Sequence, residues 1–361
     1  MISRYDATRD ELQAQLSGEP RYRVDQVWQG LYQQLAMPDE LTSLPKALRA
    51  RLEAELPLAL TEEVHRVSDG GDTVKYLWRL HDGSRIETVL MLYPDRVTVC
   101  VSSQAGCAMA CGFCATGQAG FTRHLTVGEI VEQVARAARE AKEMGRRLAN
   151  VVFMGMGEPL ANEQNVWGAV ERIHGDLGLS ARHLTISTIG IVPGIRSLSA
   201  RSLPVNLAVS LHAANDDLRN QLIPMNKRYP LDALMSACAD YLQMKGRRIS
   251  FEWALIDGLN DRDRDADELA ALCRRFQLPA HVNLIPLNPT PGWPTRGSTQ
   301  ARVREFRQLL EDRGVNATVR RNRGTDIDAA CGQLAAGQPV SVLPKPPRIA
   351  ASSVPEPWDT D

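Results

Sequence analysis

Residues 151–155 read VVFMG, residues 184–188 read LTIST and residues 205–211 read VNLAVSL, and these apolar runs decide the fold. Each run is short and rich in apolar or β-branched residues, which is typical of a strand buried on both faces. Three further runs of the same kind follow them: ISFEWALI (249–256), HVNLIP (281–286) and NATVR (316–320).

Helical patterns occupy the intervals between these runs. Thr126 and Glu129 form a capping-box pattern, which predicts an amphipathic helix that continues to about Met144. Comparable stretches lie near residues 164–175, 230–244, 264–276 and 299–313. Repeated strand–helix units predict an α/β fold with a parallel sheet and outer helices, either an open sheet or a full or partial (β/α) barrel of the TIM type. In every one of these arrangements we expect the functional residues at the carboxyl ends of the strands.

Residues 1–60 are expected to form a small helical accessory module. Val24, Val27 and Trp28 have the spacing of one helix face, and Ser43 supplies the start signal of a second helix.

Residues 61–102 change to the alternating runs TVKYLWRL, SRIETVLML and RVTVCVS, separated by turn clusters. This pattern predicts antiparallel strands that lead into the core. We assign residues 103–342 to the core and its C-terminal segment. The Pro- and Ser-rich residues 343–361 are expected to be disordered.

The composition is that of an ordinary globular protein, with 43% hydrophobic and 24% charged positions in 361 residues. No apolar run has the roughly twenty residues that a membrane span needs, and the N-terminus lacks the apolar stretch of a signal peptide. We therefore expect a cytoplasmic protein without a membrane partner. Because the net charge is only -1, a nucleic-acid partner would have to be bound by a local basic patch.

Three of the seven cysteines lie close together in the segment CAMACGFC, at Cys107, Cys111 and Cys114. Three soft ligands on one loop after a predicted strand suit a metal centre. Structural zinc usually takes four ligands in two pairs, and the sequence has no second pair and no suitably spaced histidines. A [4Fe–4S] cluster held by three thiolates leaves one iron open to a substrate or cofactor, so the pattern favours this cluster over zinc.

The spacing Cys-x3-Cys-x2-Cys, with Phe113 before the last cysteine, resembles the signature of the radical S-adenosylmethionine (SAM) enzymes. The resemblance implies that SAM binds the open iron through its amino and carboxylate groups and that reduction cleaves SAM to a 5′-deoxyadenosyl radical. It also implies that the aromatic residue lies near the adenine of SAM.

Several other segments resemble the RlmN family, whose members methylate C2 of adenine in RNA. They cover the chain from about residue 20 to 340: CVSSQAGC (100–107), FMGMGEPLAN (153–162), STIGIVPGI (187–195), AVSLHAAND (208–216), HVNLIPLNP (281–289) and RGTDIDAACGQLA (323–335). The resemblance implies 23S rRNA as a substrate, an adenosine beside the tRNA anticodon as a second one, and a one-electron donor such as flavodoxin or ferredoxin.

The resemblance also implies three catalytic residues. The residue that matches Cys331 is methylated by one SAM, and the residue that matches Cys100 resolves a later protein–RNA adduct through a transient disulfide. Glu87 matches the acceptor of the C2 proton, although by its alternating strand alone it would be a solvent-facing residue. A radical route suits this target, because C2 of adenine is electron-poor and cannot attack a sulfonium methyl group.

The residues that match the family's SAM contacts all follow predicted strands: Gly157, Glu158, Ser187, Ser210, Leu211, His212 and Asn288. Gly157 would let the backbone approach the cofactor, and Glu158 would accept a hydrogen bond from its amino group.

The target adenine must leave its stack to reach a radical, so we expect a pocket for an extruded base above the cluster. The densest candidates for phosphate contacts are Arg320, Arg321 and Arg323 near Cys331, and Lys46, Arg49 and Arg51 in the N-terminal module. Solvated charged faces are the alternative for both groups.

Three alternatives to the C2 methyltransferase remain open at this point. One is a radical SAM enzyme that acts on a protein or a small molecule, for which RNA would be dispensable. Enzymes that methylate C8 of adenine share the cluster, both thiols and the cofactor motifs. A non-catalytic iron–sulfur RNA-binding or ribosome-assembly factor would keep the cluster, but it would not need both Cys100 and Cys331.

Overall fold

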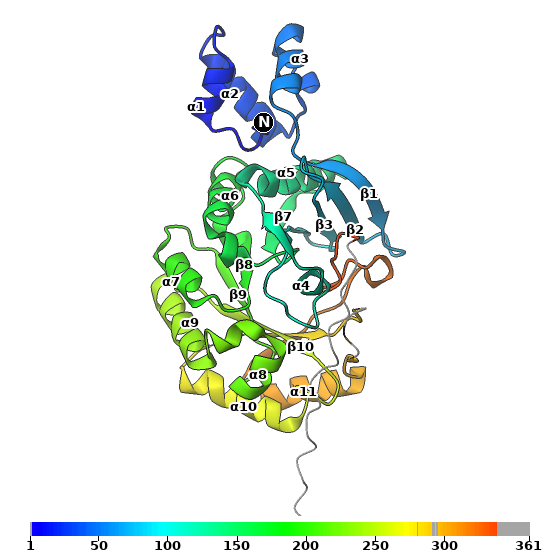
Figure 1. Ribbon diagram of the computed structural model, residues 1–361, viewed down its shortest axis with the longest axis vertical. Helices are drawn as coiled ribbons and strands as arrows, with labels where there is room; N and C mark the ends of the chain where they lie inside the picture. The colour runs from blue at the N-terminus through cyan, green and yellow to red at the C-terminus, as the bar shows by residue number, and fades with distance from the viewer. Residues whose placement is uncertain (1, 280, 291–292, 294, 338–361) are drawn as a thin grey trace, which may run out of the picture.

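The computed structural model describes residues 2–279, 281–290, 293 and 295–337, so the predicted tail 343–361 lies outside the described residues. A ten-stranded sheet forms the centre of the molecule, and helices cover its outer face (Figure 1). Its strand order is β1-β2-β3-β4-β7-β8-β9-β10-β11-β12, so almost every strand pairs with the one before it in the sequence.

The first four strands of the sheet are antiparallel: β1 (Thr61–Val67), β2 (Thr73–Arg79), β3 (Arg85–Leu92) and β4 (Val97–Cys100). β4 then pairs in parallel with β7, with Cys100 opposite Val152. The predicted antiparallel strands and the parallel core therefore share one sheet.

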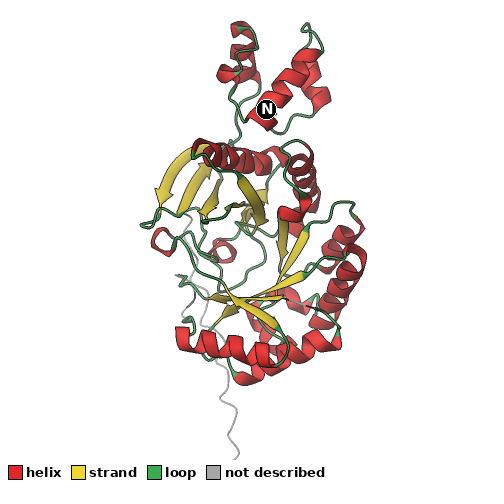
Figure 2. Cartoon of the chain, turned by 180° about the vertical axis from the view of Figure 1, so that it is seen from behind, coloured by secondary structure: helices red, strands yellow, loops and turns green. Residues whose placement is uncertain are grey.

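The remaining strands are parallel and follow the predicted apolar runs: β7 (Leu148–Phe153), β8 (Leu184–Thr188), β9 (Asn206–Ser210), β10 (Ile249–Leu255), β11 (His281–Pro286) and β12 (Asn316–Val319). The α/β fold with a mostly parallel sheet is thus confirmed. The sheet is curved (Figure 2), and within the described ranges its edge strands β1 and β12 do not pair with each other, in agreement with the expected partial barrel.

Five long helices match the predicted stretches: α5 (Val127–Glu143), α6 (Glu163–Gly175), α9 (Leu231–Lys245), α10 (Asp263–Arg275) and α11 (Gln300–Asp312). The predicted capping box is present at the start of α5. There the Thr126 hydroxyl accepts from the Glu129 amide at 3.2 Å, and the Glu129 carboxylate accepts from the Thr126 amide at 2.9 Å. The shorter helices α7 (Val192–Ala200) and α8 (Asp216–Leu222) were not predicted.

Three helices precede the sheet: α1 (Arg9–Gln15), α2 (Tyr22–Gln29) and α3 (Lys46–Glu55). Figure 1 shows them at one end of the molecule, beyond α5 and α6. The Trp28 indole donates to Asp176 at 2.8 Å, and the buried apolar residues of α2 and α3 belong to the same continuous core as the sheet. In the part of the chain that the structure describes, no helix has the length and apolar character to cross a bilayer.

Candidate active site

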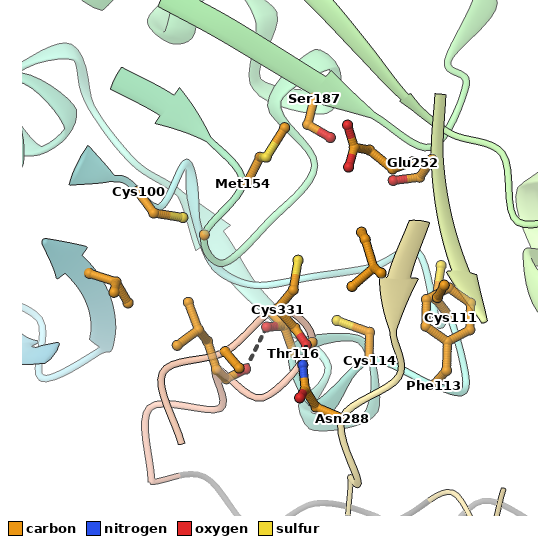
Figure 3. Close-up of a pocket in the computed structure, with 18 of the residues that line it drawn as sticks. Cys100, Cys111, Phe113, Cys114, Thr116, Met154, Ser187, Glu252, Asn288 and Cys331 are labelled. Carbon is orange, nitrogen blue, oxygen red and sulfur yellow. Dashed lines mark hydrogen bonds between the residues drawn. The ribbon is translucent and has the colours of Figure 1, made fainter. Parts of the chain in front are cut away.

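A large cavity lies at the carboxyl ends of the parallel strands, where the α/β pattern predicts function. It contains about 1510 Å³ of space between protein atoms, part of it open to solvent. Its lining comes from the ends of β4 and β7–β11, from the loop after β5 (Gln104–Gly106) and from the segment around Cys331 (Figure 3).

The three clustered cysteines all line this cavity. Cys107 and Cys111 lie on the loop between β5 and the short helix α4 (Ala115–Ala119), and Cys114 is the residue before that helix. The loop is held closed by main-chain bonds, from the Cys107 amide to Gly120 at 2.6 Å and from the Cys114 amide to Cys111 at 3.1 Å. One short loop therefore presents three thiols to one space.

The donor set suits a cluster better than a single ion. Among the described residues, no group of three or more His, Cys, Asp or Glu side chains is arranged to hold one metal ion. A [4Fe–4S] cluster does not need that arrangement, because each thiolate binds a different iron and the ligands stand farther apart. Burial raises the pKa of Cys107 to about 12 and the pKa of Cys111 as well, so a positively charged group is needed to hold both as thiolates.

Cys100 and Cys331 reach the same cavity from distant parts of the chain. Cys100 ends β4 and is buried, whereas Cys331 is solvent-exposed; both are free thiols. Figure 3 shows both sulfur atoms pointing into the cavity. Burial raises the pKa of Cys100 to about 12. It also raises the pKa of Cys331, whose thiol is surrounded by protein atoms although the residue as a whole is exposed. The positive charge of Arg320 lowers the pKa of both thiols and so opposes these shifts.

Three hydrogen bonds fix the segment that carries Cys331. The Asn288 amide donates to the Cys331 carbonyl at 3.0 Å, and the Ala115 amide donates to the Gly332 carbonyl at 2.8 Å. The Thr116 hydroxyl donates to the Leu334 carbonyl at 2.5 Å. Two of these donors lie on α4, directly after Cys114, so the cluster loop and the Cys331 segment are held together.

Glu87 lies next to the cavity but is not one of its lining residues. It is buried, not solvent-facing as its strand pattern alone indicated. Its carboxylate is 3.3 Å from the Lys75 ammonium and accepts from the Ala335 amide at 3.1 Å. Glu87 therefore contacts the Cys331 segment at Ala335, whereas Asn288 contacts it at Cys331.

Six of the seven residues expected to contact SAM line the cavity: Gly157, Glu158, Ser187, Ser210, His212 and Asn288. Leu211 does not line it. Its side chain is fully buried in the core, because side chains alternate along an extended chain and Ser210 takes the inward position.

Gly157 and Glu158 form a tight turn after β7. Gly157 has φ +103°, and a Cβ there would lie 2.6 Å from the Cβ of Gln104, so only glycine fits. The Glu158 carboxylate accepts from the amides of Leu160 (3.0 Å) and Ile189 (2.9 Å). Burial nevertheless raises its pKa to about 7, so a cation in the cavity would be favourable beside it.

His212 presents one defined donor. Its Nδ1 accepts from the Ala254 amide at 2.9 Å, and burial lowers its pKa to about 3, so the ring is neutral and carries its proton on Nε2. Its ring meets that of Phe113 edge to face, with centroids 4.9 Å apart. The aromatic residue of the cysteine motif thus lies beside an expected SAM contact.

The two groups of basic residues differ. Arg320, Arg321 and Arg323 line the cavity, and Arg323 also bonds Asp72. In the N-terminal module, Arg49 donates to the Asp39 carbonyl and Arg51 pairs with Glu55 at 3.1 Å. The structure therefore brings only the first group to the site.

Among the lining residues that the sequence did not predict, one carries a charge-bearing side chain at the end of the cavity near Ser187. Glu252, in the middle of the apolar run ISFEWALI, lines the cavity and is buried on β10. A carboxylate within an otherwise apolar strand is a signal that could have identified it.

Comparisons with known proteins agree with this site. The Radical SAM superfamily model matches residues 101–270. A curated protein of Chloroflexus aurantiacus, named "Probable dual-specificity RNA methyltransferase RlmN", is 49% identical over 97% of both chains. A protein of the same name from a Parafrankia species is 51% identical over 93% of this chain and 92% of its own. The chain belongs to the RlmN family.

A solved structure of a radical SAM methyltransferase shares the fold over most of both chains. The crystal structure of a radical SAM methyltransferase from Sphaerobacter thermophilus is 51% identical to this chain, with a TM-score of 0.90, and covers 93% of this chain and 100% of its own. RlmN proteins are radical SAM RNA methyltransferases, and radical SAM enzymes use a [4Fe–4S] cluster and SAM.

Proposed function

We propose that this protein methylates C2 of an adenine in 23S rRNA and of an adenine beside the tRNA anticodon, with Cys331 as the methyl carrier. The observation that carries this proposal is the position of two free thiols, Cys100 and Cys331, in the cavity that also contains the three cluster cysteines. A cluster with a purely structural role would need neither thiol. The name shared by the curated relatives supports RNA as the substrate and two classes of it.

We assign the cluster to Cys107, Cys111 and Cys114, and SAM to the cavity lined by Gly157, Glu158, Ser187, Ser210, His212 and Asn288. When bound, the two cofactors supply a methyl group and, after one-electron reduction by a donor such as flavodoxin or ferredoxin, a radical that removes a hydrogen atom. The raised pKa of Glu158 suits an ammonium partner, and the Nε2 proton of His212 suits an acceptor. Ribosomes and tRNA place this reaction in the cytoplasm.

The first step that we assign to a residue of this protein takes place at the sulfur of Cys331. The Cys331 thiolate takes the methyl group of one SAM, and loss of a hydrogen atom from that methyl leaves a carbon radical on Cys331. This carbon forms a bond to C2 of the extruded adenine. The adduct then gives up one electron, which the cluster assigned to Cys107, Cys111 and Cys114 would accept, and Glu87 accepts the C2 proton.

Release uses the second thiol. The Cys100 thiolate attacks the Cys331 sulfur, so an S–S bond forms, the C–S bond breaks, and its electron pair stays on carbon, which takes a proton to become the methyl group. A cellular dithiol then returns the disulfide to two thiols. Arg320, the cation that opposes the raised pKa of both cysteines, favours the thiolate that this step needs.

The test is mass spectrometry of nucleosides after anaerobic reaction of the reconstituted protein with labelled SAM, reductant and either rRNA or tRNA. We expect label in 2-methyladenosine, none with C331A, and a covalent protein–RNA adduct with C100A. Label in 8-methyladenosine would keep the thiol chemistry and overturn the position of attack. Formation of 5′-deoxyadenosine without labelled nucleoside would remove RNA as the substrate.

A further inference from the structure

The carboxylate of Glu252 lines the cavity. It lies within β10, and the register places it beside Ser210 on β9 and Asn283 on β11, so all three side chains project from the same face of the sheet. Glu252 is only 4% exposed. It therefore adds a carboxylate from β10 between two strands whose ends carry expected SAM contacts.

One oxygen of this carboxylate is fixed by the protein. The Asn283 amide donates to Oε1 at 2.8 Å, and the Asn283 carbonyl oxygen in turn accepts from the Thr318 hydroxyl at 3.0 Å. This chain of bonds across β12, β11 and β10 sets the orientation of Glu252.

The other oxygen, Oε2, has no hydrogen-bond partner among the residues that the structure describes. Oε2 is buried, and its nearest cation is Nη1 of Arg320 at 3.9 Å, beyond hydrogen-bond distance. Burying an unpaired carboxylate oxygen is unfavourable, so Oε2 needs a partner, such as water or a ligand group that enters the cavity. Figure 3 shows the Glu252 side chain at the cavity, near Ser187.

We propose that Glu252 and Arg320 bind the ribose hydroxyls of SAM. An acceptor (Oε2) and a donor (Nη1) stand side by side here, and a hydroxyl both donates and accepts. Two neighbouring hydroxyls on one sugar can use both groups at once. Ser210, the register partner of Glu252, is already an expected contact of the same cofactor, which favours SAM over the target nucleotide as the source of the ribose.

This inference rests on the proposed function for the location of SAM. The experiment is therefore a binding measurement, which does not depend on turnover or on RNA. Isothermal titration calorimetry of the anaerobic, cluster-reconstituted protein would compare SAM with its 2′-deoxy and 3′-deoxy analogues, for the wild type, E252Q and R320M.

E252Q is the informative variant because it keeps the side-chain volume and the bond from Asn283 but replaces the Oε2 acceptor by a donor. We expect E252Q to bind SAM about 10- to 100-fold more weakly, since the lost hydrogen bond has a charged acceptor. At least one deoxy analogue should bind the wild type about 10-fold more weakly than SAM does, and E252Q should not distinguish them. Glu305→Gln, the same change at an exposed carboxylate of α11, is the matched control; circular dichroism and iron content check folding and cluster loading.

Other outcomes overturn the inference and identify the reason. An unchanged Kd for SAM in E252Q would remove Glu252 from the cofactor site. If E252Q instead weakened only the binding of RNA, and a 2′-deoxyadenosine at the target position had the same effect on the wild type, the ribose would belong to the substrate. Equal binding of SAM and both deoxy analogues by the wild type would exclude ribose recognition altogether. Failure of the wild type to bind SAM would overturn the proposed function together with this inference.

Discussion

The side-chain amide of Asn288 donates a hydrogen bond to the main-chain carbonyl of Cys331 at 3.0 Å. The Asn288 carbonyl oxygen accepts from the Asn322 amide at 2.7 Å, so this residue ties the loop after β11 to the segment after β12 and to the Cys331 segment. Sequence matching indicated a SAM contact at Asn288. The structure adds a second contact, this hydrogen bond to the main chain of Cys331, the proposed methyl carrier.

Asn288→Ala separates these two contacts. Loss of the bond to Cys331 should loosen the segment by about 1 kcal/mol, which is about a fivefold effect. We expect faster alkylation of Cys331 by iodoacetamide and slower methyl transfer to RNA. If SAM affinity falls while the alkylation rate stays unchanged, Asn288 contacts the cofactor and does not position the loop.

Glu87→Gln tests the proton acceptor. Gln cannot accept the C2 proton, but its carbonyl oxygen can still accept a hydrogen bond from the Ala335 amide. We therefore expect normal methylation of Cys331 and a stalled protein–RNA adduct. Intact-mass spectrometry would detect the methylated protein, and a denaturing gel would detect the adduct. Unchanged turnover would contradict the proposed role, and loss of Cys331 methylation would show that Glu87 acts by holding the Cys331 segment.

Lys75→Met tests the buried ion pair with Glu87. Both side chains are buried, so removal of the lysine leaves an uncompensated carboxylate, which costs about 3–5 kcal/mol in the free energy of unfolding. Urea denaturation measures this change. The double variant K75M/E87Q removes both charges and should recover part of the loss; equal stability of the single and double variants would argue that the pair is not the cause.

Gly157→Ala tests the turn beside the expected SAM site. The new Cβ would lie 2.6–2.8 Å from atoms of Gln104, at a φ of +103°. Gly178→Ala is a matched control, because its φ is +74° but nothing lies within 4 Å of its Cβ. Gly178→Ala should lose about 1 kcal/mol from backbone strain alone, whereas Gly157→Ala should lose more and should also weaken SAM binding. Equal losses in stability would show that the contact with Gln104 relaxes without cost.

Glu158 should make the stability of the SAM-free protein fall as the pH rises. A carboxyl in the unfolded chain titrates near about 4.3, but burial raises the pKa of Glu158 to about 7 in the folded protein. Between these values only the unfolded chain ionises, so unfolding releases a proton, and above pH 7 the full penalty is on the order of 3 kcal/mol. The stability of E158Q relative to wild type should therefore increase between pH 4.5 and pH 7.5; a constant difference would contradict the raised pKa.

Most of the parallel core could be predicted because its signals are local. Six apolar runs became strands, and the pair Thr126 and Glu129 fixed the start of α5, since strand periodicity and capping depend on neighbouring residues. The helices α7 and α8 were missed because they are short and lie within segments that were considered only as motifs. The parallel pairing of β4 with β7 was also missed, because it depends on residues far apart in the sequence.

The residues of the site likewise divide into those that the sequence could predict and those that it could not. The cysteine loop and the turn at Gly157 carry their information in consecutive residues. Only one oxygen of Glu252 is paired, because the neighbouring strand β11 supplies a single donor, the Asn283 amide. The buried carboxylate of Glu87 contacts Lys75 from β2 and the Ala335 amide from the C-terminal segment. Residue spacing in the sequence could not predict these contacts, because they form only when the strands pair and the C-terminal segment folds over them.

The hydrogen bonds that join the Cys331 segment to α4 connect two parts of the chain that are synthesised at different times. Translation is vectorial, and early segments fold first. The loop of Cys107, Cys111 and Cys114 leaves the ribosome long before Cys331 does, so the proposed cluster ligands are synthesised before the proposed methyl-accepting thiol. Cys331 thus joins the site after the loop that carries the three clustered cysteines has been made.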